Sequence, residues 1–322
     1  MPASEYRGLL FIGDPHLEGR QPGFRKDDYP NVILEKLAWC LHYAEVHHLL
    51  PILLGDLFDK PRDNPNWMVA KLLDMWTTPL HGIYGNHDCA DPVLKDHDTL
   101  SLLVKAGRIV LLTEETVWSG IINRRPIIVG GSSYRLPIPK KYDADLMPLF
   151  GKPLVVWITH HDLLFPGWED FANVKLREIP GVDIVVNGHI HRRLAEVKLG
   201  QTLWINPGNI ARRSRTDATR EHVPSMLRLD VKGDEVSRQY VEVPHKPYEE
   251  VFHPAITSST GPSLERSAFV TGLAELLTRR TESGAGLMAF LSKNLDKFEP
   301  AVTEEIWALA KEVAEHGERE DG

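Results

Sequence analysis

The sequence predicts a layered α/β sandwich built on mixed β-sheets. Two observations indicate this class. The first hundred residues alternate between short apolar runs and stretches with helical spacing, which is typical of βα units. From residue 109 to residue 243, short strand-like runs follow one another, and the last of them alternate in the way antiparallel strands do.

Up to residue 106, three stretches carry apolar side chains at helical spacing, and three short apolar runs lie before or between them. The expected helices are residues 31–48, 67–76 and 99–106. The expected strands are residues 9–12, 51–54 and 83–84. A glycine follows each strand directly, which lets the backbone turn sharply where the strand ends.

The middle of the chain is predicted to consist mainly of strands. They are expected at residues 109–112, 117–122, 127–129, 154–158, 182–186, 203–206, 226–231 and 235–243. The last three runs have alternating faces, so we expect antiparallel pairing there.

The pattern changes after Pro244. We expect one domain over residues 1–244 and a mainly helical extension over residues 245–322. From residue 262 the apolar residues recur at helical spacing, with Ser263 as a candidate N-cap. Further helices are expected at residues 287–295 and 304–314. The extension either packs on the first domain or binds a partner.

Composition narrows the class of protein. The 322 residues are 42% hydrophobic and 25% charged, as in globular proteins, and no apolar run is long enough to cross a bilayer. The first residues lack the form of a signal peptide. Only Cys40 and Cys89 are present, which argues against a disulfide framework and fits a cytoplasmic protein. A net charge of −8 argues against a surface coated in basic residues, but is compatible with a local basic groove.

Side chains that bind metals gather just after five of the predicted strands. The five clusters are Asp14-Pro15-His16, Gly55-Asp56-Leu57-Phe58-Asp59, Gly85-Asn86-His87-Asp88, His160-His161 and Gly188-His189-Ile190-His191. Because ligands bind outside the carboxyl ends of strands in α/β sheets, we expect the clusters to converge at one edge. Imidazoles with carboxylates suit Mn, Fe, Co, Ni or Zn, whereas Mg or Ca favours oxygen ligands alone.

Each cluster has a structural alternative when it is taken alone. Asp14 before a proline and Gly85-Asn86 are common turn sequences, and His189 and His191 could be surface residues of a hairpin. All five clusters in this order, each at a strand end, favour a metal site. His160 and His161 are neighbours that point to opposite sides of the chain, so we expect only one of them to bind a metal.

The series D-x-H, G-D-x-x-D, G-N-H-D, H and G-H-x-H resembles the calcineurin-like metallophosphoesterases over roughly residues 7–210. The resemblance implies a four-layer α/β/β/α sandwich of two mixed β-sheets and an enzyme that hydrolyses phosphate esters. It also implies two divalent metal ions, with Mn²⁺ expected and Fe, Zn, Ni or Co as alternatives. The first ion is expected on Asp14, His16 and His191, and the second on Asn86, His160 and His189, with Asp56 bridging them.

The same resemblance implies roles for three residues beside the metals. His87 is expected to stabilise the leaving oxygen as an acid or hydrogen-bond donor, with Asp88 orienting it. Asp59 is expected to steer a ligating histidine without binding the metal itself. The implied reaction is attack on phosphorus by a hydroxide that bridges the two ions.

Arginines after two of the predicted strand ends favour a phosphodiester substrate. Arg192 and Arg193 follow the last cluster, and Arg212 and Arg213 follow the turn Asn206-Pro207-Gly208-Asn209. Such a group beside the metals suits a polyanion such as DNA or RNA, and the alternative is a solvated basic surface. The arrangement resembles the SbcD-type DNA repair nucleases, which implies a nuclease whose C-terminal helices could bind an ATPase partner.

Other functions stay open. A compact site in an acidic chain would suit a small-molecule phosphodiesterase acting on cyclic nucleotides or 2′,3′-cyclic phosphates. A non-catalytic, partner-binding subunit would be favoured by the loss of a metal ligand, but every expected position is filled. A Ser/Thr protein phosphatase is disfavoured because its long insertions and paired arginines are missing between the second and fourth clusters.

Overall fold

The computed structural model describes residues 6–22, 24–76, 78–144, 151–169, 172–215 and 217–254, together with residues 303, 306 and 307. The chain divides into two compact units, Met1–Pro254 and Ala255–Gly322. The helices expected after residue 262 lie outside the described residues, apart from helical backbone at residues 303, 306 and 307. Every labelled strand and helix belongs to the first unit.

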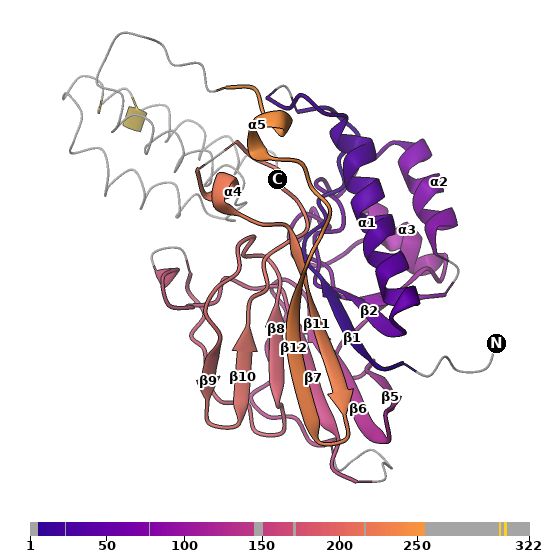
Figure 1. The fold of residues 1–322 in the computed structure, drawn as a ribbon, viewed down its shortest axis with the longest axis vertical. Coiled ribbons are helices and arrows are strands. Elements are labelled where there is room, and N and C mark those ends of the chain that lie inside the picture. Colours follow the sequence, from indigo (N-terminus) through magenta and orange to yellow (C-terminus); the bar gives the residue numbers. More distant parts are fainter. Residues whose placement is uncertain are drawn as a thin grey trace. The chain divides into compact units, whose positions relative to one another are not determined.

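Two mixed sheets of six strands each form the centre of the first unit (Figure 1). The first sheet has the order β12 (Glu235–Glu242), β11 (Ser225–Lys232), β1 (Gly8–Ile12), β2 (Leu49–Leu53), β3 (Leu80–Gly82) and β4 (Ile109–Leu111). The second has the order β5 (Trp118–Ile122), β6 (Arg125–Ser132), β7 (Leu154–Thr159), β8 (Ile184–Asn187), β10 (Thr202–Ile205) and β9 (Val197–Leu199). The expected α/β fold with two mixed sheets is confirmed.

Four neighbouring parallel strands make up most of each sheet. In the first sheet, β1 to β4 are parallel, and β11 joins β1 and β12 in antiparallel pairing. In the second sheet, β6, β7, β8 and β10 are parallel, and β5 and β9 are antiparallel edge strands. The register aligns the strand ends, with Ile12 opposite Leu53 and Thr159 opposite Asn187. The loops after these strands therefore open at a common edge.

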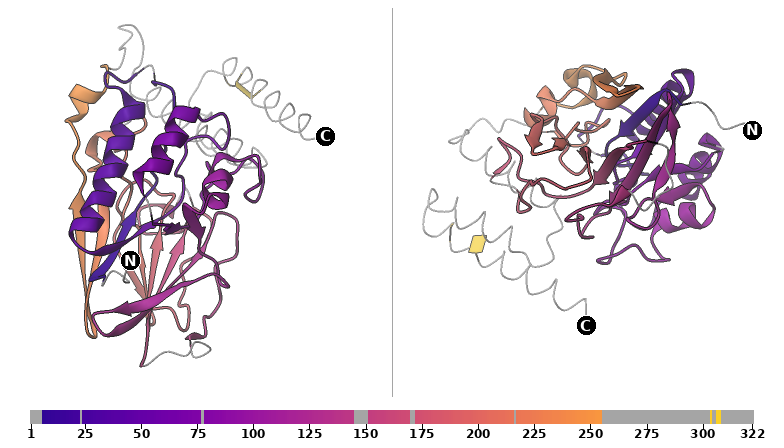
Figure 2. Two further views of the ribbon diagram at one scale, coloured as in Figure 1. Left: turned by 90° about the vertical axis from the view of Figure 1, so that its right-hand side faces the viewer. Right: turned by 90° about the horizontal axis from the view of Figure 1, so that it is seen from below.

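Three apolar clusters fill the layers because side chains alternate across each strand. On β1, Leu9 and Phe11 pack between the two sheets, whereas Leu10 and Ile12 pack against the helices. Those helices are α1 (Tyr29–Val46), α2 (Asn66–Met75) and α3 (Thr99–Lys105), and both figures show them as one layer on the first sheet (Figures 1 and 2). Within the described ranges, loop residues such as Phe165 and Ile179 cover the outer face of the second sheet.

Helix α1 begins where its sequence favours a start. The carboxylate of Asp28 accepts a hydrogen bond from the backbone amide of Asn31. Pro30 occupies the first turn, where backbone N–H groups have no partner within the helix, so the missing N–H of proline costs no hydrogen bond. Its buried face includes Ile33, Leu37 and Ala44, at helical spacing. Two short helices, α4 (Asp217–Glu221) and α5 (Tyr248–Val251), follow later in the chain. No helix of the described ranges is both long and apolar enough to span a membrane.

The structure corrects two strand predictions. The third strand lies at Leu80–Gly82 and ends before residues 83–84, because the amide of Tyr84 bonds the hydroxyl of Ser133 instead of a neighbouring strand. Strand β9 was not expected at all. The domain boundary expected after residue 244 stays a prediction, since most of the extension lies outside the described residues. The segment up to Pro254 is part of the first unit, in which the amide of His253 donates to the carbonyl of Phe24 at 2.9 Å.

Candidate metal centre

The predicted metal ligands come together from both sheets. The loops after β1, β2 and β3 come from the first sheet, and those after β7 and β8 come from the second. Together they carry Asp14, His16, Asp56, Asn86, His160, His189 and His191. Each of these side chains is buried or half-buried, so polar groups converge in a place that excludes most water.

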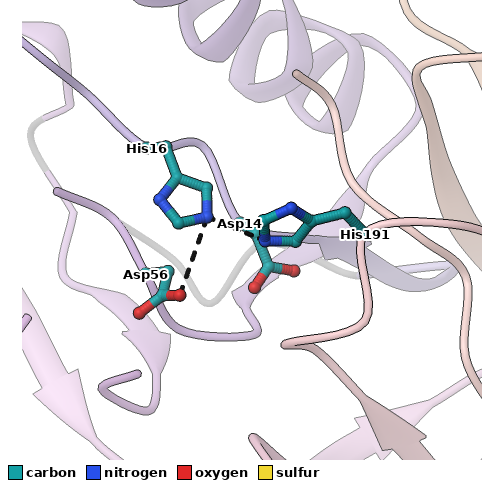
Figure 3. A group of neighbouring side chains, drawn as sticks. All are labelled: Asp14, His16, Asp56 and His191. Atoms are coloured by element: carbon teal, nitrogen blue, oxygen red, sulfur yellow. Dashed lines mark hydrogen bonds and ion pairs between the residues drawn. The ribbon is translucent and has the colours of Figure 1, made fainter. Parts of the chain in front are cut away.

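The first group consists of Asp14, His16, Asp56 and His191, whose ligand atoms lie within 4.8 Å of one another (Figure 3). Nε2 of His16 lies 2.9 Å from Nε2 of His191 and 3.6 Å from Oδ2 of Asp56. Two imidazole nitrogens and a carboxylate oxygen therefore face one point. The set predicted for the first ion is brought together here, with Asp56 added.

The second group consists of Asp56, His160 and His189, and Asn86 lies beside it. Nε2 of His160 lies 3.2 Å from Oδ2 of Asp56 and 3.3 Å from Oδ1 of Asn86. Nδ1 of His189 lies 2.9 Å from the same amide oxygen and 3.3 Å from Nε2 of His160. The residues predicted for the second ion thus surround a second point.

Asp56 belongs to both groups, as a bridging ligand must. Its Oδ1 accepts a hydrogen bond from the backbone amide of His87 at 2.8 Å. Its Oδ2 lies near His16 on one side and His160 on the other. One oxygen is therefore used to hold the carboxylate in place, and the other faces both groups of nitrogens.

Four of these positions hold their backbone in the left-handed region. The φ angles are 40° at Asp14, 49° at His16, 46° at Asp56 and 69° at His189. Such angles are uncommon outside glycine and cost on the order of 1 kcal/mol or more each. They persist only where the surrounding contacts hold them, and they aim these side chains at the common centre rather than along the strands.

Glycine is required next to the bridging carboxylate. A Cβ atom on Gly85 would lie 2.1 Å from Oδ1 of Asp56 and 2.6 Å from Cε1 of His160. Gly55 has a φ of 99°, and a Cβ there would lie 2.5 Å from Nδ1 of His160. The glycines that end the predicted strands are thus the residues that let the ligands approach one another.

The residues present fit metal ions. Oδ2 of Asp14 is buried without a hydrogen-bond partner in the described residues. Nδ1 of His160 donates to the carbonyl of Leu54 at 2.7 Å, so in the neutral ring Nε2 keeps its lone pair and turns it toward three other acceptor atoms. Acceptors that face one another without a proton between them are stabilised by a cation. Nitrogen and oxygen ligands in this mixture match Mn, Fe, Co, Ni or Zn.

Electrostatics keep most of the first group ready to bind a cation. Burial lowers the pKa of His16 to about 4, and burial together with the neighbouring His16 lowers the pKa of His191 well below its usual value. Both rings are therefore neutral at pH 7, as a metal ligand must be. Burial would raise the pKa of Asp56, but the charges of His160 and His87 outweigh it and hold that pKa well below the usual range.

Two groups have pKa values shifted toward the protonated form. Burial raises the pKa of Asp14 to about 7, and the nearby Asp56 adds to that rise, against the lowering effect of His160. Burial lowers the pKa of His160, but Asp56 and Asp14 outweigh it and raise the pKa to about 9. A proton on His160 thus neutralises charge that a metal ion would otherwise neutralise, and it must leave when a metal binds there.

Asp59 lies behind the first group, where it was expected. Its Oδ1 is 3.4 Å from Nδ1 of His16, on the far side of the ring from the nitrogen that faces the site. Arg213 donates from Nη2 to Oδ2 of Asp59 at 2.9 Å. Burial raises the pKa of Asp59, but the close contact with His16 and the charge of Arg213 outweigh it, so that pKa is lowered. Asp59 is therefore an anion that can orient His16.

His87 lies at the edge of the site. Its side chain is 16% exposed, and its ring centroid is 4.8 Å from that of His16. Nδ1 of His87 donates to the backbone carbonyl of Asp59 at 2.8 Å. His87 also forms a third group of possible metal ligands with His16 and Asp59. Its exposure distinguishes it from the fully buried His16 and suits a side chain that meets substrate.

The structure corrects the role expected of Asp88. Its carboxylate accepts hydrogen bonds from the amides of Gly85 at 2.9 Å, Phe58 at 3.0 Å and Leu57 at 3.3 Å. The group that holds His87 is the carbonyl of Asp59. Asp88 therefore joins the loops after β2 and β3 through their backbones, because a buried carboxylate is stabilised best by several N–H donors.

Arg212, predicted to bind substrate, is buried in the structure. Its side chain is buried, with Nε donating to the carbonyl of His222 and Nη1 to the carbonyl of Lys246, both at 2.9 Å. The carbonyl of Arg212 itself accepts a bond from Arg25. These contacts explain why this arginine turns inward, since it supplies donors to loop carbonyls that no strand or helix bonds.

The other arginines of the predicted group have different surroundings. Arg192 and Arg193 are exposed. The guanidinium of Arg192 lies 4.8 Å from the ring centroid of Trp168, and that of Arg193 lies 4.6 Å from that of Tyr240. These two remain available to a polyanion. Arg213 is bound to Asp59 and sits next to the first group of ligands.

His161 does not join the ligands. Its Nε2 lies 2.9 Å from the carbonyl of Leu136, so of the two adjacent histidines only His160 faces the site. Two residues near the ligands were not anticipated. Oδ1 of Asp162 lies 2.9 Å from Nε2 of His189, and the ring of Tyr134 stacks on His189 at 6.0 Å. The spacing could have identified Asp162, because in an extended segment it lies on the same side as His160.

Buried asparagines support the loops of the second sheet. Nδ2 of Asn187 donates to Oδ1 of Asn206 at 3.0 Å. Nδ2 of Asn206 in turn donates to the carbonyls of Ile190 and Arg192, both at 2.8 Å. These bonds fix the backbone on both sides of His191, so its position depends on residues that bind no substrate.

The chain is similar to one family model and to several solved structures. The model of the calcineurin-like phosphoesterase superfamily domain matches residues 11–234, and no curated protein matches the chain. Among solved structures, a hypothetical protein from Thermus thermophilus is 13% identical, with a TM-score of 0.40 and coverage of 74% of this chain and 100% of that one. A predicted phosphoesterase from Streptococcus pneumoniae is 12% identical, with a TM-score of 0.34 and coverage of 76% and 93%. Vps29 from Chaetomium thermophilum is 14% identical, with a TM-score of 0.31 and coverage of 75% and 100%.

The matched residues include every strand from β2 to β10 and all seven predicted ligands. They make up well over half of the chain. This protein belongs to the calcineurin-like phosphoesterase superfamily.

Proposed function

We propose that this protein is a metal-dependent phosphodiesterase that hydrolyses phosphodiester bonds of nucleic acids. The observation that carries the proposal is the position of Asp56, whose Oδ2 faces both groups of histidines. Two cations held by one carboxylate are suited to phosphoryl transfer, because together they stabilise the attacking and the leaving oxygen.

The first ion would be held by Asp14, His16 and His191, and the second by Asn86, His160 and His189, with Asp56 shared. We expect Mn²⁺, since mixed nitrogen and oxygen ligands accept it, and Fe, Zn, Ni or Co are alternatives. When bound, such ions supply a water of near-neutral pKa and neutralise charge on the phosphoryl oxygens.

The chain itself supplies a donor for the leaving oxygen. His87 has Nδ1 engaged with the carbonyl of Asp59, which fixes the ring and leaves Nε2 to interact with substrate. Its partial exposure lets it reach a bound phosphodiester. Because Nδ1 already holds one proton, Nε2 can donate only when the ring carries a second one, and in that form His87 acts as a hydrogen-bond donor or acid that stabilises the charge developing as the ester bond breaks.

The exposed arginines favour a polymer as substrate. Arg192 and Arg193 follow the second sheet's ligand loop by one and two residues, and both guanidinium groups rest on aromatic rings. Such a pair can bind phosphates on either side of the bond that is cut. A nuclease of the SbcD type fits these features, with the C-terminal extension as the candidate binding surface for an ATPase partner.

A specific observation favours a second candidate. Arg212 is buried and Arg213 is bound to Asp59, so only two of the four arginines predicted to bind substrate are exposed to an extended backbone. Fewer cationic groups suit a compact substrate. The alternative function is therefore hydrolysis of cyclic nucleotides or 2′,3′-cyclic phosphates at the same metal site.

The deciding experiment compares hydrolysis rates with added Mn²⁺ on single-stranded DNA, duplex DNA, RNA, 3′,5′- and 2′,3′-cyclic nucleotides and an aryl phosphodiester. The nuclease proposal predicts that the polymers are cleaved fastest. It also predicts that Arg192→Ala with Arg193→Ala slows polymer cleavage more than aryl phosphodiester cleavage. Faster cleavage of a cyclic nucleotide, or equal loss on both substrates, would contradict it.

A matched control removes two basic side chains at the end of the sheets that lies opposite the metal site. Arg124 lies in the turn between β5 and β6, and Lys232 ends β11, next to the start of β1. Arg124→Ala with Lys232→Ala changes the net charge equally but leaves the site intact. Polymer cleavage by this control should match the wild type. An equal loss in the control would show that overall charge, not the two arginines beside the site, governs binding.

A further inference from the structure

We propose that Asp162 is a positioning residue that fixes the tautomer and the orientation of His189, so that Nδ1 of this ring faces the second metal ion. Oδ1 of Asp162 lies 2.9 Å from Nε2 of His189, and Asp162 is neither in the predicted ligand set nor in either group that shares Asp56. The inference rests on the proposed metal-dependent function, but it concerns a contact within the chain.

The chemistry of the two partners decides where the proton lies. A carboxylate only accepts hydrogen bonds, so the contact with Asp162 requires a proton on Nε2 of His189. In the neutral imidazole the lone pair is then on Nδ1. That nitrogen lies 2.9 Å from Oδ1 of Asn86 and 3.3 Å from Nε2 of His160, which are the other atoms of the second group. Asp162 thus selects the tautomer that can bind a cation.

The backbone of Asp162 is held in position by the loop that follows it. The carbonyl of Asp162 accepts hydrogen bonds from the amides of Val174 at 3.0 Å and Asn173 at 3.3 Å. Its side chain is 24% exposed and that of His189 is 10% exposed, so the carboxylate is the more exposed partner of the pair. A fixed acceptor in this position can orient the ring before any cation arrives.

Two other contacts hold the ring and its backbone. The ring of Tyr134 stacks on His189 with a centroid distance of 6.0 Å and an angle of 30°. The amide of His189 donates to Oδ1 of Asp14 at 2.8 Å, with its backbone in the left-handed region. The face of the ring and its main chain are therefore already fixed, and Asp162 supplies the remaining restraint, on rotation and protonation.

The expected effect is confined to one ion. Outer partners of metal-binding histidines typically change metal affinity by about 10–100-fold. His189 contributes its ring only to the second group. Loss of Asp162 should therefore lower the affinity for one ion by that factor and leave the affinity for the other unchanged. Loss of a residue that only stabilised the fold would lower the affinity for both ions together.

The test measures binding of Mn²⁺ to the metal-free full chain by calorimetry, for the wild type, Asp162→Ala and the isosteric Asp162→Asn. We expect two binding events in the wild type, selectively weaker binding of one ion in Asp162→Ala, and a smaller loss for the same ion in Asp162→Asn, whose amide oxygen can still accept from Nε2 of His189. Glu169→Ala is the matched control, because it removes an acid from the same loop whose carboxylate bonds the amide of Gly167 instead. Wild-type affinity for both ions in the Asp162 variants, or equal weakening in the control, would overturn the inference.

A second measurement separates this inference from the proposed function. Nitrogen-15 NMR of the metal-free protein reports which ring nitrogen of His189 carries the proton. We expect protonated Nε2 in the wild type and a mixture of tautomers in Asp162→Ala. A wild type that binds no metal would overturn the proposed function, whereas a His189 with its proton on Nδ1 would overturn the role of Asp162 whatever the metal affinity.

Discussion

The backbone amide of His87 donates a hydrogen bond to Oδ1 of Asp56 at 2.8 Å. This bond couples the two residues that matter most to the proposed chemistry. It leaves Oδ2 of Asp56 to both groups of histidines, and it fixes the loop that presents the ring of His87 at the edge of the site. Because the bond uses the main chain, the side chain of His87 can be changed without removing it.

His87→Ala should therefore separate chemistry from metal binding. The variant keeps the amide that bonds Asp56 but loses the donor for the leaving oxygen, so we expect kcat to fall by about 10²–10⁴-fold. Metal content should stay at the wild-type level. Steady-state kinetics with elemental analysis of the same preparation measure both quantities.

The control for this variant is His97→Ala, which removes an exposed histidine from the same loop. Its kcat and metal content should both match those of the wild type. Loss of either ion in His87→Ala would assign His87 to the third group, with His16 and Asp59, as a metal ligand.

Arg212→Ala should destabilise the protein rather than weaken substrate binding alone. The substitution removes two hydrogen bonds to the carbonyls of His222 and Lys246, and at about 0.5–1.5 kcal/mol for each bond we expect a loss of about 1–3 kcal/mol. Urea unfolding should show a loss of that size. Arg192→Ala, at an exposed position, should leave the unfolding free energy within about 0.5 kcal/mol of the wild type.

His222 should make the folded state sensitive to acid. Burial lowers its pKa to about 4, and Nε2 donates to the carbonyl of Asn209 at 3.1 Å. In the unfolded chain the pKa is near 6.5, so below that pH the unfolded state binds a proton that the folded state does not. The contribution of His222 to stability is complete above pH 6.5 and is lost as the pH falls toward 4. At pH 5 the loss amounts to about 1–2 kcal/mol.

The measurement is the free energy of unfolding at pH 7.5 and pH 5 for the wild type and His222→Gln, with a chelator present throughout. Glutamine does not titrate but can still donate to the carbonyl of Asn209. We expect the wild type to lose more stability between the two pH values than the variant does. The same loss in both proteins would show that His222 does not carry this pH dependence.

The strand ends made much of the site predictable from sequence. Each ligand cluster follows an apolar run, and glycines such as Gly55 and Gly85 mark the turns where a side chain would collide with the ligands. Parallel strands in register then bring the loops to one edge, whatever their separation along the chain. The local pattern was therefore sufficient to predict which side chains meet.

Side-chain partners far along the chain were less predictable. The inward turn of Arg212 depends on a carbonyl at Lys246, and the three donors that Asp88 bonds come from two separate loops. Neither arrangement leaves a periodic signal in the sequence. Strand β9 has only three residues, too few to show alternation, and it is defined by its pairing with β10.

The central claim is that Asp56 holds both metal ions, and Asp56→Asn tests it most directly. An asparagine oxygen can still accept the amide of His87, but an uncharged amide then faces His16 and His160 in place of the shared oxygen. The control is Asp183→Asn at the amino end of the second sheet's strands, where the carboxylate bonds the amide of Val155.

The measurement is the number of Mn²⁺ ions bound per chain after equilibrium dialysis. We predict two ions for the wild type and for the control, and affinity reduced by more than about 100-fold for both ions in Asp56→Asn, beyond the effect of an outer partner. Asp56→Asn that retains two ions with wild-type affinity, or loses only one, would contradict a shared carboxylate between two metal sites.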